Sequence, residues 1–222
     1  MIDNLRTIIS FPVPGFVQVT AHVSFGTRKE LSGLKPFFKE QRAWACEQPM
    51  ASVAGMDRRE AAARRGLWAE EKVVLRRQGR LIDSLDALVT GGLSREVEER
   101  GWNREWEACP RQAKAQGRSP GSPDGVWEEP VTVRLPADLV HTVYCACWHT
   151  SKDARDLLEK WQASHPKARP NRMSRPGCDA AALAEYQEIR SKIIHRGDIW
   201  RAAVITGIGN ARAVQRPATD TE

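Results

Sequence analysis

Residues 130–151 join a short alternating segment to a run that is apolar on nearly every side, which restricts the possible folds strongly. Within 131–135, apolar residues alternate with Thr132 and Arg134, a pattern typical of a strand with one buried face. Pro136 favours the first turn of a helix, and residues 137–149 predict a helix with apolar side chains all around it. Such a helix has to be buried on all sides, and a partner chain provides that more readily than a small domain.

The residues that follow predict a capped turn and a second helix. Thr150 to Asp153 fit a capping box, and residues 152–164 carry one apolar face. This order of strand, helix, turn and helix resembles the ribbon-helix-helix (Arc/MetJ-like) DNA-binding family. The resemblance is carried by the strand VTVRLP, the helix entry 136–139 and the Thr150-Ser151 turn. Residues 198–208 also resemble the closing helix of such a module, so the sequence leaves two candidates for that helix.

The resemblance implies that two copies of the chain pair their strands as an antiparallel ribbon above interlocked helices. The outward strand residues, Thr132 and Arg134, would then enter the major groove of DNA, which admits a two-stranded ribbon. Backbone amides near Ser151 and Lys152, at the start of the second helix, would bind phosphate.

The charge of the chain is compatible with a polyanionic partner. The formal net charge is +6 and the isoelectric point is near 9.3. Residues 165–176 contain four basic residues and no acid, and this loop is predicted either to follow a DNA backbone or to be a solvated connector. The four residues are Lys167, Arg169, Arg172 and Arg175.

Residues 57–89 show the most regular helical pattern, with apolar pairs that recur every seven residues. They predict one long amphipathic helix, which residues 93–110, capped by Ser94, would join in a hairpin. The apolar stripe is either a seam for self-association or a surface packed within the same chain. The pairs are Leu67/Trp68, Val74/Leu75, Leu81/Ile82 and Leu88/Val89.

The predicted fold class is mostly α with minor β: a long amphipathic helix or helical hairpin, a linker, and a strand-helix-helix domain. The clearest boundary is a Gly-, Ser- and Pro-rich segment before the opening stretch. The predicted parts are an N-terminal appendage with one strand (1–55), a helical hairpin (56–110), a flexible linker (111–129), a basic domain (130–210) and a disordered tail (211–222).

Residues able to bind a metal gather in one place. His141, Cys145 and His149 lie along one stripe of the helix predicted at 137–149, so they form a candidate metal site. No phosphate-binding loop, dinucleotide fingerprint, nucleophile elbow or zinc-protease motif occurs in the sequence. We therefore expect no enzyme activity, no cofactor and no small-molecule substrate.

The expected partners are DNA and a second copy of the chain, with no membrane. No apolar stretch is long enough to span a bilayer, the first residues lack the features of a signal peptide, and a cytoplasmic location is expected. The sequence thus predicts a dimeric DNA-binding regulatory protein of bacterial type. The alternative is a helical assembly protein without catalytic activity, of the kind that accompanies plasmids and other mobile elements.

Overall fold

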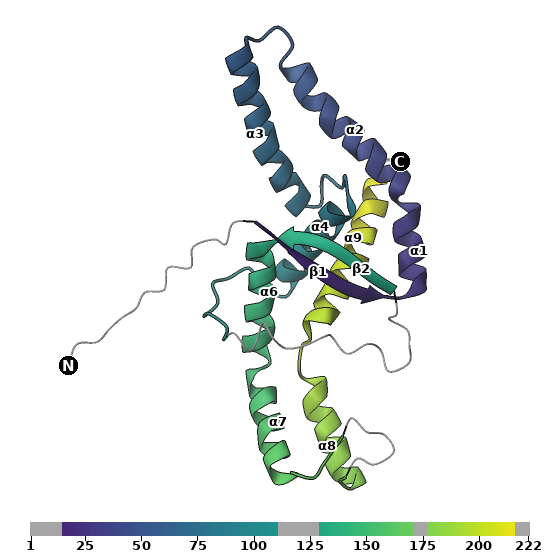
Figure 1. The fold of residues 1–222 in the computed structure, drawn as a ribbon, viewed down its shortest axis with the longest axis vertical. Helices are drawn as coiled ribbons and strands as arrows, with labels where there is room; N and C mark the ends of the chain where they lie inside the picture. The colour runs from purple at the N-terminus through teal and green to yellow at the C-terminus, as the bar shows by residue number, and fades with distance from the viewer. Residues whose placement is uncertain (1–14, 111–128, 171–176, 216–222) are drawn as a thin grey trace, which may run out of the picture.

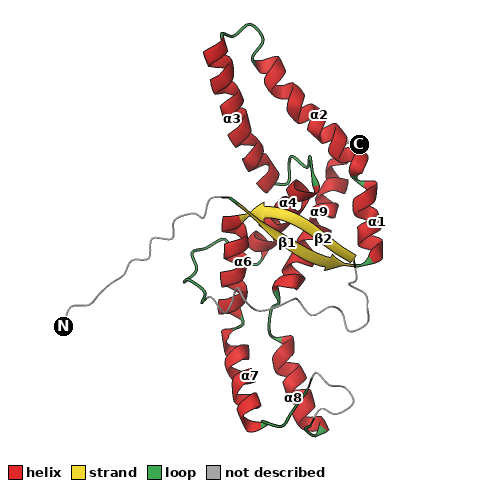
Figure 2. Cartoon of the chain, viewed as in Figure 1, coloured by secondary structure: helices red, strands yellow, loops and turns green. Residues whose placement is uncertain are grey.

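The structure, a computed structural model, describes residues 15–110, 129–170 and 177–215, and it is mostly helical with one small two-stranded sheet (Figures 1 and 2). The predicted fold class is therefore confirmed. The described elements are β1 (Phe16–Val23), α1 (Phe25–Gly33), α2 (Lys35–Ser52), α3 (Arg58–Arg77), α4 (Leu85–Glu99), β2 (Glu129–Pro136), α6 (Ala137–Thr150), α7 (Lys152–Ser164), α8 (Ala180–Ser191) and α9 (Arg196–Gln215).

The two strands form an antiparallel ribbon in which Phe16 lies opposite Pro136 and Val23 lies opposite Glu129. One face of the ribbon is buried and the other is exposed, as the alternation in both strands predicts. We expected β2 to pair with β2 of a second copy of the chain, but along this edge β2 pairs with β1 of the same chain. The same chain supplies the partner, because β1 has the same alternation and the same length. The buried residues are Val19, Ala21, Val23, Val131, Val133 and Leu135.

Helices α4 and α9 cross beneath the ribbon and form the centre of the core. The two helices approach closely because, at the crossing, each has a glycine that faces the backbone of the other helix. A Cβ atom added to Gly92 would lie 2.0 Å from the carbonyl oxygen of Ala203, and one added to Gly207 would lie 2.5 Å from that of Leu88. Only residues without a side chain permit this separation.

The two halves of the chain repeat one order of elements, and the contacts follow an approximate two-fold relation. Each half has a strand, a helix that begins directly after it, and three further described helices. Helix α4 packs on β2 of the other half, and α9 correspondingly packs on β1. In Figure 1, α1 leaves one end of the ribbon and α6 leaves the other in the opposite direction.

The relation is visible at the level of residues. A shift of 112 takes Thr20 to Thr132, and these two face one another across the ribbon with their hydroxyl oxygens 3.2 Å apart. A shift of 115 takes Arg95 to Asn210, which are hydrogen-bonded, and takes Gly92 to Gly207. Both shifts place symmetry-related residues against each other, so the ribbon and the helix crossing lie near the same two-fold axis.

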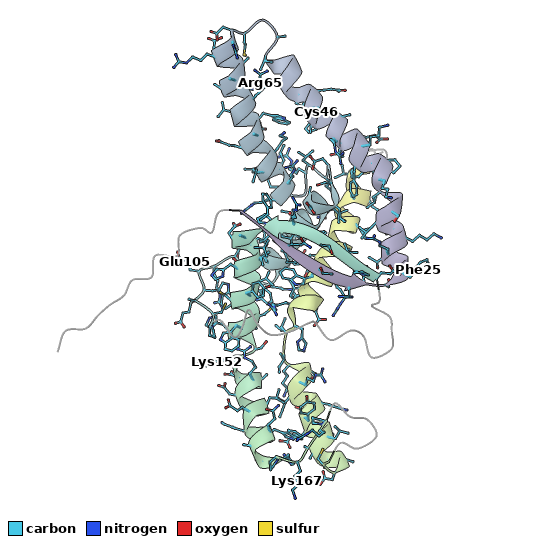
Figure 3. The ribbon with its side chains drawn as sticks, in the orientation of Figure 1. Phe25, Cys46, Arg65, Glu105, Lys152 and Lys167 are labelled. Atoms are coloured by element: carbon cyan, nitrogen blue, oxygen red, sulfur yellow. The ribbon has the colours of Figure 1, made fainter. Side chains whose placement is uncertain are left out.

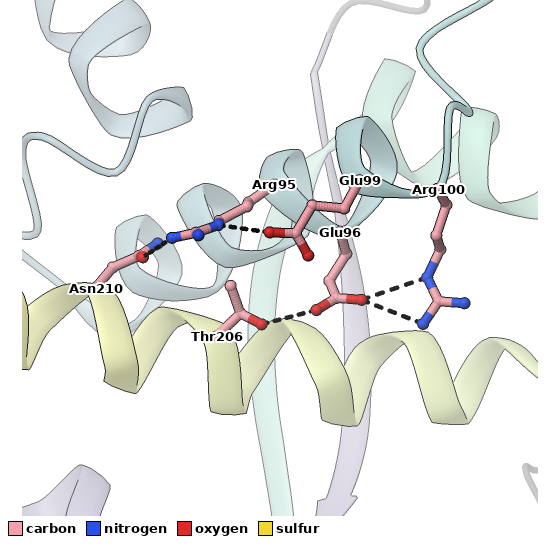
Figure 4. Close-up of polar contacts among 6 residues, drawn as sticks. All are labelled: Arg95, Glu96, Glu99, Arg100, Thr206 and Asn210. Carbon is pink, nitrogen blue, oxygen red and sulfur yellow. Dashed lines mark hydrogen bonds and ion pairs between the residues drawn. The ribbon is translucent and has the colours of Figure 1, made fainter.

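Polar contacts also join α4 to α9 (Figure 4). The buried carboxylate of Glu96 accepts a hydrogen bond from the Thr206 hydroxyl at 2.7 Å and two from the Arg100 guanidinium. Arg95 donates to the Asn210 side-chain oxygen at 3.1 Å. A buried charge needs such partners, and here they fix the alignment of the two helices.

The long helix predicted at 57–89 is interrupted. Helix α3 ends at Arg77, Gly79 has a φ of +67°, and α4 begins at Leu85 after the Ser84 N-cap. The apolar pair Leu81/Ile82 lies in this connection and is fully buried. The predicted second helix at 93–110 is wrong, because Ser94 lies inside α4. The seven-residue spacing of apolar pairs continues across this turn because Leu81 and Ile82, although they lie in a connection, are buried in the core.

The remaining helices form two hairpins that project from the core at opposite ends (Figure 1). Helices α2 and α3 form one, in which the indole nitrogen of Trp68 donates to the carbonyl oxygen of Ala45. Helices α7 and α8 form the other, around Trp161 and Tyr186. Of the two candidates for the closing helix, α9 packs against the ribbon, whereas α7 belongs to a separate small core.

The predicted domain boundaries do not separate independent cores. Residues from 1–55, 56–110 and 130–210 share one hydrophobic cluster, so the strand and first helices are not an appendage. The linker predicted at 111–129 lies outside the described residues except for its last position, where β2 begins. Residues 211–215 belong to α9, with Ala211 fully buried, so the disordered tail does not begin at 211.

Candidate functional site

The exposed face of the ribbon gathers polar side chains from both halves of the chain. At its centre, Thr20 and Thr132 are hydrogen-bonded to each other. On one side of them Gln18 lies opposite Arg134, and on the other His22 lies opposite Pro130. All of these residues are exposed, whereas Val19, Ala21, Val131 and Val133, which alternate with them, are buried. The face is therefore a narrow polar surface on a rigid support.

The backbone of Arg134 is fixed by α4. Its amide donates to the Asp86 carboxylate at 3.0 Å, so the outer edge of β2 is bound to the first turn of that helix. The Arg134 side chain is exposed and, within the described residues, makes no hydrogen bond or ion pair, so an external acceptor can reach it.

A pocket of about 320 Å³ adjoins this end of the ribbon, between the end of α3 and the start of α4. Three arginines line it: Arg76, Arg77 and Arg134. Arg76 is paired with Asp83, and Arg77 with Asp138 at 2.7 Å. Asp86 and the apolar side chains of Phe16 and Val73 line it as well, so the lining is mixed and the charges of Arg76 and Arg77 are already neutralised.

The structure brings together only some of the residues predicted to bind DNA. Thr132 and Arg134 share the ribbon face, but Ser151 is buried and its hydroxyl accepts a hydrogen bond from the Ile194 amide at 2.9 Å. Lys152 begins α7, beyond the far end of α6 from the ribbon (Figure 3). The Ser151 backbone amide, which was expected to bind phosphate, donates to the carbonyl oxygen of Cys147 at 3.3 Å instead.

The basic loop predicted at 165–176 also lies away from the ribbon. Lys167 lies at the end of the α7/α8 hairpin (Figure 3), and Arg169 donates to the carbonyl oxygen of Ala168. Arg172 and Arg175 lie outside the described residues. Sequence reasoning instead missed Gln18, Thr20 and His22, although their alternating pattern was evident, because it did not identify β1 as the partner of β2.

A second cluster lies on α6. The ligand atoms of Cys109, His141 and Cys145 lie within 4.8 Å of one another. His149, the third residue of the predicted metal set, contacts the carbonyl oxygen of Glu107 at 2.9 Å instead. Only the tertiary structure brings Cys109 to this position, because it is far from α6 in the sequence.

The neighbouring Cys147 points into the main core and differs from the two clustered cysteines. Burial raises the pKa of its thiol to about 12, against the lowering effect of Arg196 and Arg100. Cys147 is therefore protonated at neutral pH and acts as a small apolar core residue.

Comparison with known protein families, curated proteins and solved structures gave no match to this chain. Among the described helices, none combines the length and the apolar character that crossing a bilayer requires.

Proposed function

We propose that this chain is a regulatory protein that binds double-stranded DNA through the exposed face of the β1/β2 ribbon. The observation that carries the proposal is the set of outward polar side chains on a two-stranded antiparallel ribbon whose other face is buried. A ribbon of this width fits the major groove. It would be a ribbon-helix-helix-like reader in which one chain supplies both strands.

The chemistry of the face suits base recognition. Arg134 can pair bidentately with guanine, and the Gln18 amide directly opposite can pair bidentately with adenine. The threonine hydroxyls at the centre can contact either a base edge or a thymine methyl group. Because both strands are held by the core, these side chains would approach the groove with little loss of backbone entropy.

The approximate two-fold relation favours an imperfect palindrome as the DNA site. Half-sites reflect the symmetry of the protein that reads them. The shift of 112 that relates the central threonines takes His22 to Arg134. The two half-sites would thus be read by different side chains and would differ in sequence.

Basic residues at both ends of the ribbon suit the phosphate backbone on either side of the groove. Arg76 and Arg77 lie beside one end, and Arg28 and Lys29 are exposed in α1, which begins at the other end. Contacts of this kind position a protein on DNA and make its affinity fall steeply with salt.

The test compares Arg134→Ala with Arg65→Ala, which removes the same charge near the tip of the α2/α3 hairpin (Figure 3). A duplex is first enriched from a random-sequence pool by the wild-type protein, and affinities are then measured by fluorescence anisotropy across salt. We expect Arg134→Ala to weaken binding by at least roughly 10-fold and to relax base preference. Arg65→Ala should change affinity by less than roughly twofold.

Equal affinities of the two variants for the enriched duplex would contradict the proposal, as would failure of the pool to yield any preferred sequence. Circular dichroism checks that both variants keep the helical content of the wild type.

A second candidate function, helical assembly without DNA, is favoured by one observation on α3. Leu67, Val73 and Val74 are 58%, 47% and 51% exposed, respectively. Exposed apolar side chains grouped on one helix are typical of a contact surface. We infer that, if the ribbon does not bind DNA, this α3 surface is where the chain would meet a second copy.

A further inference from the structure

We propose that Cys109, His141 and Cys145 bind a Zn²⁺ ion, which joins the segment after α4 to helix α6. The three residues come from two separate parts of the fold: Cys109 from the chain that follows α4, and the other two from successive turns of α6. Two cysteines and one histidine are a ligand set that zinc uses in sites where water takes the fourth coordination position.

The ligand atoms lie close enough together for one ion to bind all three after the side chains rotate. The Cys145 Sγ atom lies 3.6 Å from the His141 Nε2 atom and 3.9 Å from Nδ1, so the sulfur sits beside the ring. Zn–S and Zn–N bonds at the tetrahedral angle place sulfur and nitrogen about 3.6 Å apart, with the ring nitrogen directed at the ion. The imidazole therefore has to turn to bind zinc, and the Cys109 sulfur is already within 4.8 Å of both other ligand atoms.

The surroundings favour thiolates bound to a cation. Cys145 is 1% exposed and Cys109 is 9% exposed, and both pack against aromatic rings. Two thiolates, a neutral imidazole and Zn²⁺ sum to zero charge, which lowers the cost of placing the site against an apolar wall. Sulfur and imidazole ligands select Zn²⁺ over Mg²⁺ and Ca²⁺. The aromatic residues are Trp106, Tyr144 and Trp148.

The segment that carries Cys109 is already held on α6 by other contacts. Trp106 stacks on His149 with ring centroids 6.0 Å apart, and the His149 ring contacts the carbonyl oxygen of Glu107. Cys109 is therefore delivered to its position without the ion. The ion would close this junction where the chain leaves the first half of the molecule, and three protein ligands leave one coordination position to water.

The test measures metal in the full-length protein, purified under reducing conditions, dialysed against ZnCl₂ and then freed of loose metal. Mass spectrometry of the eluate should find about one zinc per chain for the wild type and for Cys178→Ser, and only a trace for Cys109→Ser and Cys145→Ser. Cys178 is the matched control, because it is a partly buried cysteine in the separate α7/α8 core.

Cobalt provides a second readout that does not depend on stability. Co²⁺ added to the metal-free wild type should give thiolate-to-metal charge transfer and the intense ligand-field bands of tetrahedral Co²⁺. His141→Ala, which keeps both thiols, should retain charge transfer but shift and weaken the ligand-field bands. Wild-type protein without stoichiometric zinc and without these bands would overturn the proposal. So would a peptide map of the protein, purified under reducing conditions, that joins Cys109 to Cys145 through a disulfide.

Discussion

At the scale of single residues, Gly92 and Gly207 determine how closely the two halves of the molecule pack. Each faces the backbone of the opposite helix, and the added Cβ atoms would meet carbonyl oxygens that cannot rotate away. Glycine in a helix interior costs about 1 kcal/mol relative to alanine, so its presence at both equivalent positions indicates that the close crossing contributes more than this cost.

Gly92→Ala should therefore destabilise the protein by about 3 kcal/mol, because the new methyl group would force α4 and α9 apart. The measurement is urea unfolding followed by circular dichroism. Gly66→Ala is the control: this glycine lies in exposed α3 with nothing within 4 Å of an added Cβ atom. The Gly66→Ala variant should be more stable than the wild type by up to about 1 kcal/mol. A Gly92→Ala variant as stable as Gly66→Ala would disprove the close crossing.

Sequence reasoning identified two members of the candidate metal cluster and missed the third. His141 and Cys145 were evident from their spacing of four residues on a predicted helix. His149 fits that stripe equally well, yet its ring contacts the backbone of Glu107. Periodicity shows which residues share a helix face, but it cannot show that a distant cysteine packs against that face.

At the scale of elements, α3 is the helix whose apolar pattern is least accounted for by the rest of the molecule. Trp68 packs toward α2, where its ring lies edge-on to Trp44. Leu67 and Val74, two turns apart, remain more than half exposed. The predicted stripe is thus real on α3, but its other members lie beyond the turn at Gly79 and serve the core.

If this α3 surface mediates self-association, the double variant Leu67→Asp with Val74→Asp should convert the oligomer to monomer, because it places two charges in an apolar contact. The measurement is light scattering coupled to size exclusion. Ala62→Asp with Ala69→Asp adds the same charges on the opposite, exposed side of α3 and should leave the mass unchanged. An identical mass for the wild type and both variants would exclude α3 as an assembly surface.

Most single elements were predicted well where their ends carry local signals. Helix α8 follows the Asp179 N-cap, and α2 has Pro36 in its first turn, and both are signals that the sequence itself carries. The helix predicted at 152–164 is confirmed as α7. The 57–89 prediction failed because the apolar spacing continued through Gln78 and Gly79, where only the backbone conformation reveals a turn.

At the scale of the whole molecule, neither half has a complete core of its own. Within the described residues, β1 and β2 form one two-stranded sheet, and each half places its last helix on the strand of the other half. A half chain would expose the buried face of its strand and one side of its central helix. Folding therefore requires both halves, and one chain contains both.

The fragments 1–113 and 114–222 should each lack a cooperative thermal transition and should regain one when mixed in equal amounts. Circular dichroism at the helical minimum measures the transition, and the intact chain is the reference. We expect this result because the last helix of each half packs on the strand of the other half, so each fragment contains the packing partners that the other lacks. A sharp transition of 114–222 alone, with the stability of the intact chain, would contradict this interdependence.

The order of elements that the two halves share has only a short counterpart in the sequence. Val19-Thr20 corresponds to Val131-Thr132, and Val23 corresponds to Leu135. The helices that follow differ in length and composition, so two hairpins of different size flank one approximately symmetric centre. Short strands share too few residues for the similarity to stand out before the structure places them together.

The sequence by itself determined the local features: mostly helical content, the two strands, several helix starts and the helix at 137–149, although this helix is buried on one side and not on all sides. These follow from backbone preferences and periodicity, which act over a few residues. Only the tertiary structure decided which strand pairs with β2, which helix covers the ribbon and which cysteine reaches His141. Those choices depend on contacts between residues that are distant in the sequence, more than a hundred positions apart in the case of the two strands. The local pattern permits several arrangements, and side-chain packing together with the close backbone approach of α4 and α9 selects one of them.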